Sequence, residues 1–549
     1  MKKNLLTGIM LAAIAMPVFA GTTDEIANKY PGYKLSFSEE FETGTVPDHD
    51  VWNFEYGFKR NEEDQLYRDD PSNAFIRDGK LVIRALSDTT KNPFYSPLSS
   101  DKNKKKKFTH TSASMQSVPR FHFGIWETCA KLPIGSGYWP AIWGTGNTKG
   151  WPSAGELDIM EYYGDAIHAN LAWGDDWQHT KWNSRAPRMA EFATDFADVY
   201  HIWRCEWDHN SVRIYLDDRL LNETDLDMTV NSDGYNPYRD PDNGFQVWLN
   251  LALGGINGGD YKNATYPAEY LVEYTRVYEP ASADAALIYR IHKAEKLLEG
   301  TMEGDEPMQY PAEARKKLSD AIEIAKEQLG ATDDEVIDTA LDALQGAMDT
   351  YENSMSTGIK VGEPFSLLHT ASNCYLSTGW FENHECVLVL NKGEEGYNQM
   401  FTLVETPEGA STKGYNILTG DGKYVYRTSW NLYVTDDASK LKNNDYIFNL
   451  EIADGKIVIK NAGSGKYFGS DNTTAWSHLY SDKAGKGNSK AYFELAELSG
   501  IEGVLAGDSD VSGVYNLQGM RVADNIEAVC GTGRTYIVLR GTKASKMVL

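Results

Sequence analysis

Between residues 21 and 280 the sequence is a long succession of short β-type runs. Apolar and β-branched residues dominate segments such as 80–85, 211–216 and 246–253, and Gly, Pro, Asn and Asp separate these segments. Turn residues end strands, so the pattern predicts many short strands joined by tight connections. The expected fold class of this region is all-β, in the form of one large sandwich.

The periodicity changes near residue 281. Apolar side chains then recur at three- and four-residue spacing through residues 285–298, 312–329 and 334–351. This spacing places them on one face of each segment, which is typical of amphipathic helices. Residues 281–356 are therefore expected to form a small helical bundle after the sandwich.

Strands return from residue 357, together with an internal repeat. A short motif with a central tyrosine occurs at Tyr375, Tyr424 and Tyr467, and a tryptophan follows each motif. Three similar units of roughly 40–50 residues predict a pseudo-threefold β module over residues 357–499, and the spacing resembles that of ricin-type β-trefoils. The repeated tryptophans are candidate accessory sugar-binding residues, although core symmetry would require them equally well. They are Trp380, Trp430 and Trp476.

Both ends of the chain resemble export signals. Two lysines precede an apolar run over residues 5–19, and a small residue follows at Ala20. This order predicts a secretory signal peptide over residues 1–20, and no cysteine follows it that would carry a lipid anchor. No later apolar run is long enough to cross a bilayer, so we expect a secreted or cell-surface protein without membrane insertion. Residues 500–549 resemble the C-terminal β segments that act as sorting signals on some exported Bacteroidetes proteins.

Charge and cysteine content limit the partners. The formal net charge is −26 at neutral pH, and nucleic acid or an anionic membrane would require a basic face, so we expect neither as a partner. The one basic run, at residues 104–107, is interpreted as a solvated loop. Five cysteines are too few for a disulfide scaffold, although Cys374 and Cys386 are close enough in sequence to pair. We expect a monomer.

Three carboxylates lie within six residues, at Glu156, Asp158 and Glu161. On a strand, alternate side chains share a face, so the first two point the same way. Strict alternation would turn Glu161 to the other face. One extra residue, a β-bulge at residues 159–160, would return Glu161 to the face of the other two acids.

Such a set of acids fits one kind of chemistry well. Retaining glycoside hydrolysis requires two carboxyl groups about 5–5.5 Å apart, one an ionised nucleophile and the other an acid with a raised pKa. A third carboxyl group can hold the nucleophile by a hydrogen bond. An acidic edge or a calcium site would explain the spacing as well, but aromatic residues at Trp139, Trp143 and Trp151 shortly precede the acids.

Residues 21–280 resemble glycoside hydrolase family 16, the laminarinase-like β-jelly-roll endo-glycanases. Glu156, Asp158 and Glu161 match the family signature E-[ILV]-D-x-x-E in its bulge-containing form. Four further segments match family motifs in the same order, namely residues 61–67 (N-x-E-x-Q-x-Y), 139–143 (W-P-A-x-W), 249–255 and 272–278. The resemblance implies a β-jelly-roll sandwich as the catalytic domain.

The resemblance also implies residue roles. Glu156 would be the nucleophile, Asp158 its assistant and Glu161 the acid/base. The concave cleft would be lined by Asn61, Trp139 and Trp143. The family further suggests a structural Ca²⁺ on the convex face, near Glu40 and Glu273, and no catalytic cofactor.

The strand after the acids departs from the laminarinase pattern. It reads His168-Ala-Asn-Leu-Ala-Trp-Gly174, where typical laminarinases arrange Gly and His differently. Trp173 is therefore a candidate sugar platform on the leaving side, or else a core tryptophan. This difference bears on which sugar the enzyme binds more than on the hydrolytic reaction itself.

Three functions follow from these observations. The leading hypothesis is a retaining endo-glycosidase that hydrolyses β-1,3- or mixed β-1,3/1,4-glucan. A second keeps the mechanism but takes a β-galactoside chain, such as a host mucin-type glycan or an algal galactan. A third is a non-catalytic glycan-binding surface protein, whose sequence mark would be the loss of an acid, and all three acids are present.

Overall fold

The structure is a computed structural model of the chain. It describes residues 23–89, 92, 95–98, 108–381, 383–391, 398–410, 412–453, 455–470, 475, 477–480, 489–496, 511–515, 521–523, 535–540 and 543–548. The predicted signal peptide, the basic run at residues 104–107 and Trp476 lie outside the described residues.

The described residues form two compact units. The first unit contains the residues up to Lys296 together with residues 321–346, and the second contains residues 297–320 and 347–549. The units therefore divide within the helical segment. The sandwich and part of the helices belong to one body.

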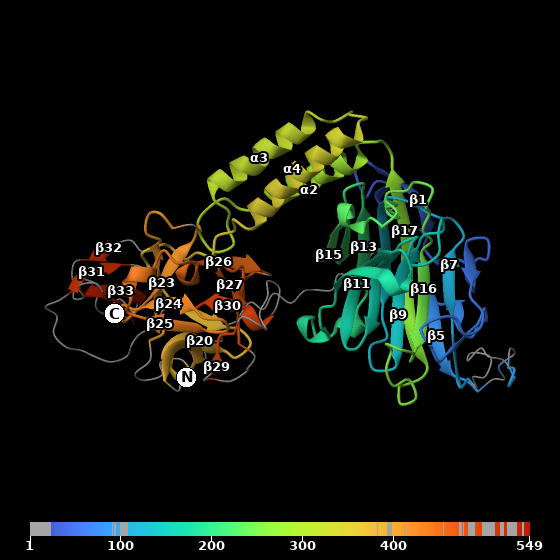
Figure 1. Cartoon of the computed structure of the whole chain (residues 1–549), viewed down its shortest axis with the longest axis horizontal. Coiled ribbons are helices and arrows are strands. Elements are labelled where there is room, and N and C mark those ends of the chain that lie inside the picture. Colours follow the sequence, from blue (N-terminus) through green and yellow to red (C-terminus); the bar gives the residue numbers. More distant parts are fainter. Residues whose placement is uncertain are drawn as a thin grey trace, which may run out of the picture. The chain divides into compact units, whose positions relative to one another are not determined.

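The first unit is the predicted sandwich of two sheets (Figure 1). The larger sheet contains ten strands, in the order β15-β14-β13-β8-β17-β5-β6-β3, with β1 paired to β17 and β4 to β5. Its strands are β1 (Tyr33–Glu39), β3 (Leu66–Tyr67), β4 (Ala74–Ile76), β5 (Leu81–Ser87), β6 (His110–Ser112), β8 (Gly124–Lys131), β13 (His201–Trp207), β14 (Ser211–Leu216), β15 (Arg219–Asp225) and β17 (Ala268–Pro280).

The smaller sheet contains seven strands, in the order β12-β11-β10-β9-β16-β7-β2, and all its pairs are antiparallel. Its strands are β2 (Trp52–Phe54), β7 (Ser114–Ser117), β9 (Tyr138–Thr145), β10 (Glu156–Tyr163), β11 (Ala166–Gly174), β12 (Thr180–Arg185) and β16 (Trp248–Leu253). Alternate side chains of both sheets meet in a core that includes Leu157, Leu171, Trp203 and Leu249. The other face of the smaller sheet is left to carry polar groups.

Helices follow the sandwich as predicted, after a short N-terminal helix α1 (Thr23–Ala27). They are α2 (Ala285–Glu299), α3 (Ala312–Lys326) and α4 (Asp334–Glu352). Tyr289 of α2 packs edge-on against Tyr30 and Tyr33, with ring centroids 5.5 and 5.9 Å apart. Helix α2 therefore covers the outer face of the larger sheet instead of extending into solvent.

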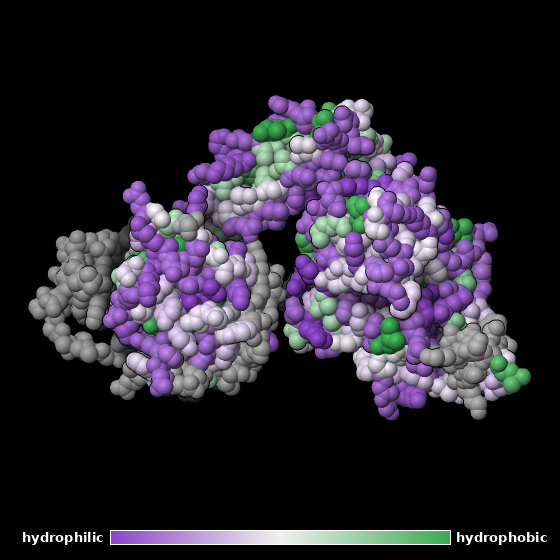
Figure 2. All heavy atoms as spheres, viewed as in Figure 1, coloured by the Kyte–Doolittle hydropathy of each residue, from purple (hydrophilic) through white to green (hydrophobic). Residues whose placement is uncertain are grey.

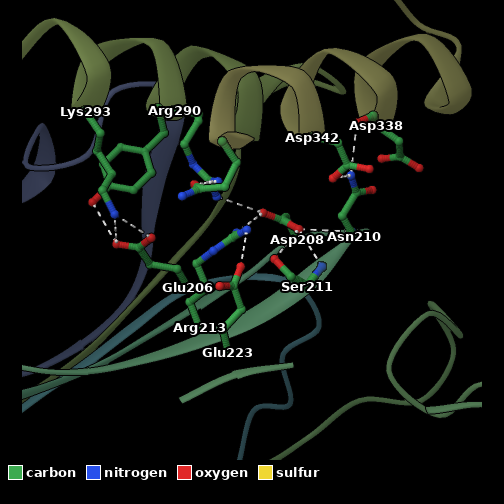
Figure 3. Close-up of polar contacts among 12 residues, drawn as sticks. Glu206, Asp208, Asn210, Ser211, Arg213, Glu223, Arg290, Lys293, Asp338 and Asp342 are labelled. Atoms are coloured by element: carbon green, nitrogen blue, oxygen red, sulfur yellow. Dashed lines mark hydrogen bonds and ion pairs between the residues drawn. The ribbon is translucent and has the colours of Figure 1, made fainter. Parts of the chain in front are cut away.

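Ionic contacts fasten α2 and α4 to that sheet (Figure 3). Glu206 of β13 accepts hydrogen bonds from Lys293 Nζ at 3.0 and 3.2 Å. Asp208 accepts one from Arg290 of α2 at 3.4 Å, and Asn210 donates to Asp342 of α4 at 2.8 Å. Glu206, Asp208 and Arg290 are buried, so the helices shield these charges from water.

Helices α3 and α4 enclose a groove of about 460 Å³ with apolar walls. Ile324 and Val336 line it and remain exposed, and Ala321, Ala340 and Leu344 complete the apolar lining. Figure 2 shows this as a green stretch over the helices on a surface that is otherwise mainly hydrophilic. Parts of both helices therefore keep apolar surface in contact with solvent.

The second unit is β-rich, as expected after residue 357. Its main sheet contains thirteen strands, and Phe401, Phe448 and Phe493, one from each predicted repeat, are buried in one core cluster. The strands are β18 (Pro364–Phe365), β19 (Leu367–His369), β20 (Cys374–Phe381), β21 (His384–Leu390), β22 (Phe401–Glu405), β23 (Tyr415–Thr419), β24 (Tyr424–Arg427), β25 (Leu432–Thr435), β26 (Phe448–Ala453), β27 (Lys456–Asn461), β28 (Tyr467–Phe468), β29 (Ser477–His478) and β30 (Phe493–Leu495).

The suggested pairing of Cys374 with Cys386 is wrong, because both are free thiols. They lie at opposite ends of the β20–β21 hairpin, where Cys386 faces Gly379. The C-terminal β segment is a four-stranded sheet, in the order β32-β31-β33-β34. Its strands are β31 (Val511–Tyr515), β32 (Arg521–Ala523), β33 (Thr535–Arg540) and β34 (Lys543–Val548). Within the described residues, no helix is both long and apolar enough to span a membrane.

Candidate active site

The predicted bulge is present in strand β10. Asp158 pairs with Asn170 of β11 and Glu161 pairs with His168, so residues 159–160 together oppose one residue of the neighbouring strand. Both residues of the bulge are buried in the core between the sheets. The bulge therefore returns Glu161 to the face that carries Glu156 and Asp158, which we call the carboxylate face.

Glu156 is held by a tryptophan from a neighbouring loop. The Trp151 indole Nε1 donates to Glu156 Oε2 at 2.5 Å. Burial raises the pKa of Glu156, while the Trp151 hydrogen bond and the positive charge of Arg60 act in the opposite direction. These two groups favour the ionised carboxylate, which is the form that a nucleophile requires.

Glu161 is held differently. The Trp139 indole Nε1 donates to Glu161 Oε1 at 2.8 Å, and Asn170 Nδ2 reaches both Glu161 Oε2 at 3.4 Å and Asp158 Oδ2 at 3.3 Å. Burial, opposed by the Trp139 hydrogen bond and reinforced by the negative charge of Glu156, raises the pKa of Glu161 to about 7. A carboxyl group with this pKa can give and take a proton at neutral pH.

Asp158 lies between the two glutamates along the strand and is buried. Burial and the negative charges of Glu161 and Glu156 raise its pKa well above the ordinary value. Like charges at close range cannot all ionise, so Asp158 retains its proton when a neighbour is charged. The three acids therefore differ in the neighbours that raise or lower the pKa of each.

An arginine accompanies the aromatic residues of this face. The Arg60 guanidinium lies over the Trp143 ring at 5.1 Å and over the Trp248 ring at 5.4 Å, and these two rings stack at 4.9 Å. Arg60 also forms an ion pair with Glu55. Trp143 is thus partly covered by its neighbours. Asn61 adopts a positive φ of 55° in the adjoining turn and is exposed.

Two predicted sugar platforms have a different place from the one expected. Trp139 is only 5% exposed, so it serves the acid Glu161 as a hydrogen-bond donor and offers little ring surface. Trp173 lies in the core between the sheets, and its assignment as a sugar platform is wrong. Asn170 faces the carboxylates, and strand alternation turns Trp173, three positions later, to the opposite side.

The predicted calcium ligands already have cationic partners. Glu40 accepts two hydrogen bonds of 2.7 Å from Arg276, and Glu273 accepts one of 3.0 Å from Lys80. Both acids line one small pocket, but no cluster of three or more His, Cys, Asp or Glu suited to a metal occurs among the described residues. The donor set as it stands does not fit Ca²⁺, and the ion remains a prediction from the family resemblance.

The accessory tryptophans in the second unit are open to solvent. Trp380 is 65% exposed and Trp430 is 59% exposed, whereas core tryptophans would be covered. Lys466 lies 5.8 Å from the centre of the Trp430 ring. Exposure on this scale leaves indole surface free for a ligand.

Several residues of the site escaped the sequence reasoning. Arg60, Asn170 and Trp248 reach the carboxylate face only through strand pairing and loop packing, which bring together residues far apart in the chain. The sequence held a local signal for Asn170. It lies two positions after His168, in the strand that follows the acids, and alternate residues of that strand face the same side as the acids with which they pair.

A family model described as "Glycosyl hydrolases family 16" matches residues 80–276. A glucan endo-1,3-beta-glucosidase from Cryptopygus antarcticus is 31% identical over 261 residues, which are 44% of this chain and 92% of that protein. The chain belongs to glycosyl hydrolase family 16.

Other relatives of this family 16 protein share its catalytic region. Glucan endo-1,3-beta-glucosidase A1 of Niallia circulans is 28% identical over 272 residues, and the match covers 45% of this chain but only 38% of that relative's length. A solved structure described as "Prominent members of the human gut microbiota express endo-acting O-glycanases to initiate mucin breakdown" shares 30% identity. The matched region covers 46% of this chain and 92% of the solved chain, and the TM-score is 0.42.

Proposed function

We propose that this family 16 protein is a retaining endo-glycosidase that hydrolyses internal bonds of β-1,3- or mixed β-1,3/1,4-glucan. The observation that carries the proposal is the bulge in β10, which gathers Glu156, Asp158 and Glu161 on one face. The surroundings of Glu156 suit a nucleophile, and those of Glu161 suit an acid. The names of the glucan endo-1,3-beta-glucosidases among its relatives support the choice of glucan.

In the first half of the reaction, the Glu156 carboxylate attacks the anomeric carbon, and the bond to the leaving oxygen breaks. Glu161, with a pKa of about 7, gives its proton to that oxygen. A glycosyl ester on Glu156 and a shortened glycan result. Asp158 keeps a proton beside the nucleophile, and Asn170 holds Asp158 and Glu161 in place.

In the second half, Glu161 is ionised and takes a proton from water. The oxygen of that water attacks the anomeric carbon, the ester bond to Glu156 breaks, and the carboxylate is restored. Two inversions leave the β configuration unchanged. The same strand therefore supplies both groups that act on the sugar.

The test is a reducing-end assay on laminarin, barley glucan, agarose and mucin glycans, with wild type and Glu156→Gln. We expect wild-type activity on the glucans and loss of turnover in the variant, because a neutral amide cannot displace the leaving group. Folding of the variant is checked by its unchanged thermal unfolding. Full activity of Glu156→Gln would refute the role of Glu156, and a wild type that binds glucan without cleaving it would favour a non-catalytic glycan-binding protein.

A second substrate class is favoured by the departure in strand β11. His168, Asn170 and Ala172 pair with Glu161, Asp158 and Glu156, so the unusual residues lie directly beside the catalytic acids. We propose β-galactoside chains of mucin-type glycans or algal galactans as the alternative substrate. Release of products from mucin glycans or agarose alone would replace the glucan proposal with this one.

We also propose that the protein acts outside the cell as a monomer, and that its second unit is a trefoil-like module that binds sugar. The exposed rings of Trp380 and Trp430 support the latter. A module that holds the polymer would raise the effective concentration of substrate at the active site.

Affinity electrophoresis in gels that contain laminarin tests this sugar binding. The Trp380→Ala/Trp430→Ala double variant should migrate faster than the wild type, and equal migration would exclude these two residues as sugar ligands. Light scattering of the purified chain checks the monomer.

A further inference from the structure

Two tryptophans that were not among the residues predicted to line the cleft have free indole surface near the catalytic strand. Trp151 and Trp182 are each 48% exposed, whereas Trp139 is 5% exposed. Sugar rings present apolar C–H faces, and ligand sites are commonly lined by aromatic side chains. Tryptophans with exposed rings are therefore the candidates for stacking against the sugar rings of the glycan.

Strand pairing places Trp182 on the carboxylate face. Glu156 of β10 pairs with Ala172 of β11, and Ala172 pairs with Trp182 of β12. Directly opposite residues of antiparallel strands point to the same side, so these three side chains form one row. Neighbouring strands lie about 4.8 Å apart, which puts the Trp182 backbone roughly 10 Å from that of Glu156.

The rest of β12 fixes the direction of Trp182. Asn183, the next residue, points to the other side, where its Nδ2 donates to Glu223 O and Thr224 Oγ1, both at 2.9 Å. Ala172 carries only a methyl group between Glu156 and Trp182 and is fully buried. No bulky side chain therefore separates the nucleophile from the tryptophan along this row.

The loop that carries Trp151 is tied to the same edge of the sheet. Ser153 Oγ donates to Asp175 O at 2.6 Å, just after the end of β11, and Asn231 Nδ2 donates to Ser153 O at 3.0 Å. Trp151 itself donates to Glu156. Trp151 therefore contacts the nucleophile from a loop that is anchored to the rest of the sandwich by hydrogen bonds.

We propose that Trp182, together with Trp151, forms a sugar-stacking subsite next to Glu156, which determines how long a glycan the enzyme prefers. The inference rests on the proposed function, because it takes the carboxylate face as the place of hydrolysis. A sugar unit beside the reacting one lies with its apolar face on the Trp182 ring. Longer oligosaccharides fill this subsite, and the shortest cleaved ones leave it empty.

The test compares kcat/KM of Trp182→Ala and wild type on an oligosaccharide ladder prepared from the polysaccharide that the wild type cleaves. We expect a loss of about tenfold or more on long members and a much smaller loss on the shortest cleaved member. Trp182→Phe, which keeps an aromatic face, should restore most of the preference. Lys181→Ala is the matched control, since Lys181 neighbours Trp182 on the strand but points to the opposite side, and should stay within about twofold of wild type.

Equal losses at every length, or none, would overturn the subsite. Glu156→Gln distinguishes this from failure of the proposed function: if that variant is inactive while Trp182→Ala keeps the wild-type length preference, only the subsite is refuted. If the wild type hydrolyses no member of the panel, the proposed function falls, and the subsite falls with it.

Discussion

Glu156, Asp158 and Glu161 have nearly the same chemistry, yet each has a different environment. Burial raises the pKa of all three. Trp151 and Arg60 oppose this at Glu156, whereas Asp158 has two acidic neighbours and is only weakly compensated. The division of work between the acids therefore comes from their neighbours.

The pKa of Glu161 sets the alkaline side of the pH profile. The acid must be protonated in the first step, so kcat/KM should fall as pH rises through about 7. With an aryl glycoside that has a good leaving group, Glu161→Ala should retain turnover and lose this alkaline fall. Added azide should accelerate the variant and yield a β-glycosyl azide. An alkaline limb that persists in Glu161→Ala would assign it to another group.

Arg60 should set the acidic side. Burial raises the pKa of Glu156, the Trp151 hydrogen bond and the positive charge of Arg60 limit that rise, and the active enzyme has this carboxylate ionised. Removing the charge in Arg60→Gln raises the pKa of Glu156, so the acidic limb of kcat/KM should move to higher pH. Lys59→Gln, an exposed neighbour, is the matched control and should leave the limb in place. A limb that does not move in Arg60→Gln would contradict the assignment.

The roles of single residues were predictable only where the signal was local. The three acids and the bulge lie in one short segment, so sequence alone located them and the structure confirms the bulge. The sequence left Trp173 open between a sugar platform and the core, because its face depends on the phase of β11, which is known only once Asn170 is seen to face the acids. Trp182 was missed because its nearness to Glu156 comes from pairing across three strands.

At the scale of elements, α2 and the larger sheet share buried ion pairs (Figure 3). Burial alone would raise the pKa of Glu206, but Lys293, Arg204 and Arg290 hold it below the ordinary value. A carboxyl group with a lowered pKa stabilises the fold above its unfolded pKa, and this stabilisation is lost as pH falls through the folded pKa. The contact between helix and sheet should therefore weaken in acid.

Glu206→Gln tests this contact. The variant leaves the cations of Lys293 and Arg204 without a buried counter-charge, so we expect a loss of about 1–3 kcal/mol in unfolding free energy at neutral pH. The loss should shrink in acid, where wild-type Glu206 is also protonated. Urea unfolding of the wild type and the variant at several pH values measures the difference in unfolding free energy. Glu223→Gln, in the same cluster but with a side chain 40% exposed, should cost less than about 1 kcal/mol.

The helices themselves were predictable from their periodicity, but their contact with the sheet was not. Strand β13 alternates Trp203, Cys205 and Trp207 with Arg204 and Glu206, a pattern typical of a strand with one face in water. The charged face is instead covered by α2, and Lys293 and Arg290 neutralise its acids. Pairing of charges between distant segments leaves no mark in local periodicity.

At the scale of the whole molecule, the catalytic body extends beyond the sandwich. A chain that ends after Pro280 lacks the three helices. Glu206 and Asp208 then lose their ion-pair partners Lys293 and Arg290 and become exposed to solvent. We expect it to unfold at a lower temperature than a chain ending after Glu352, which keeps all three helices. Thermal unfolding of the two fragments measures the difference in unfolding temperature, and light scattering shows whether either fragment aggregates. Equal stability would show that the helices are only a spacer.

The bulge in β10 also has a consequence for inheritance. The bulge absorbs one extra residue between Asp158 and Glu161, so loss of the codon for residue 159 or 160 would remove the extra residue and the bulge together. The three acids would then stand at alternate positions of a regular strand, which share one face. A one-codon deletion that would turn over the rest of an ordinary strand therefore preserves the catalytic geometry here, and descendants of this gene can shorten the strand at this point without giving up hydrolysis.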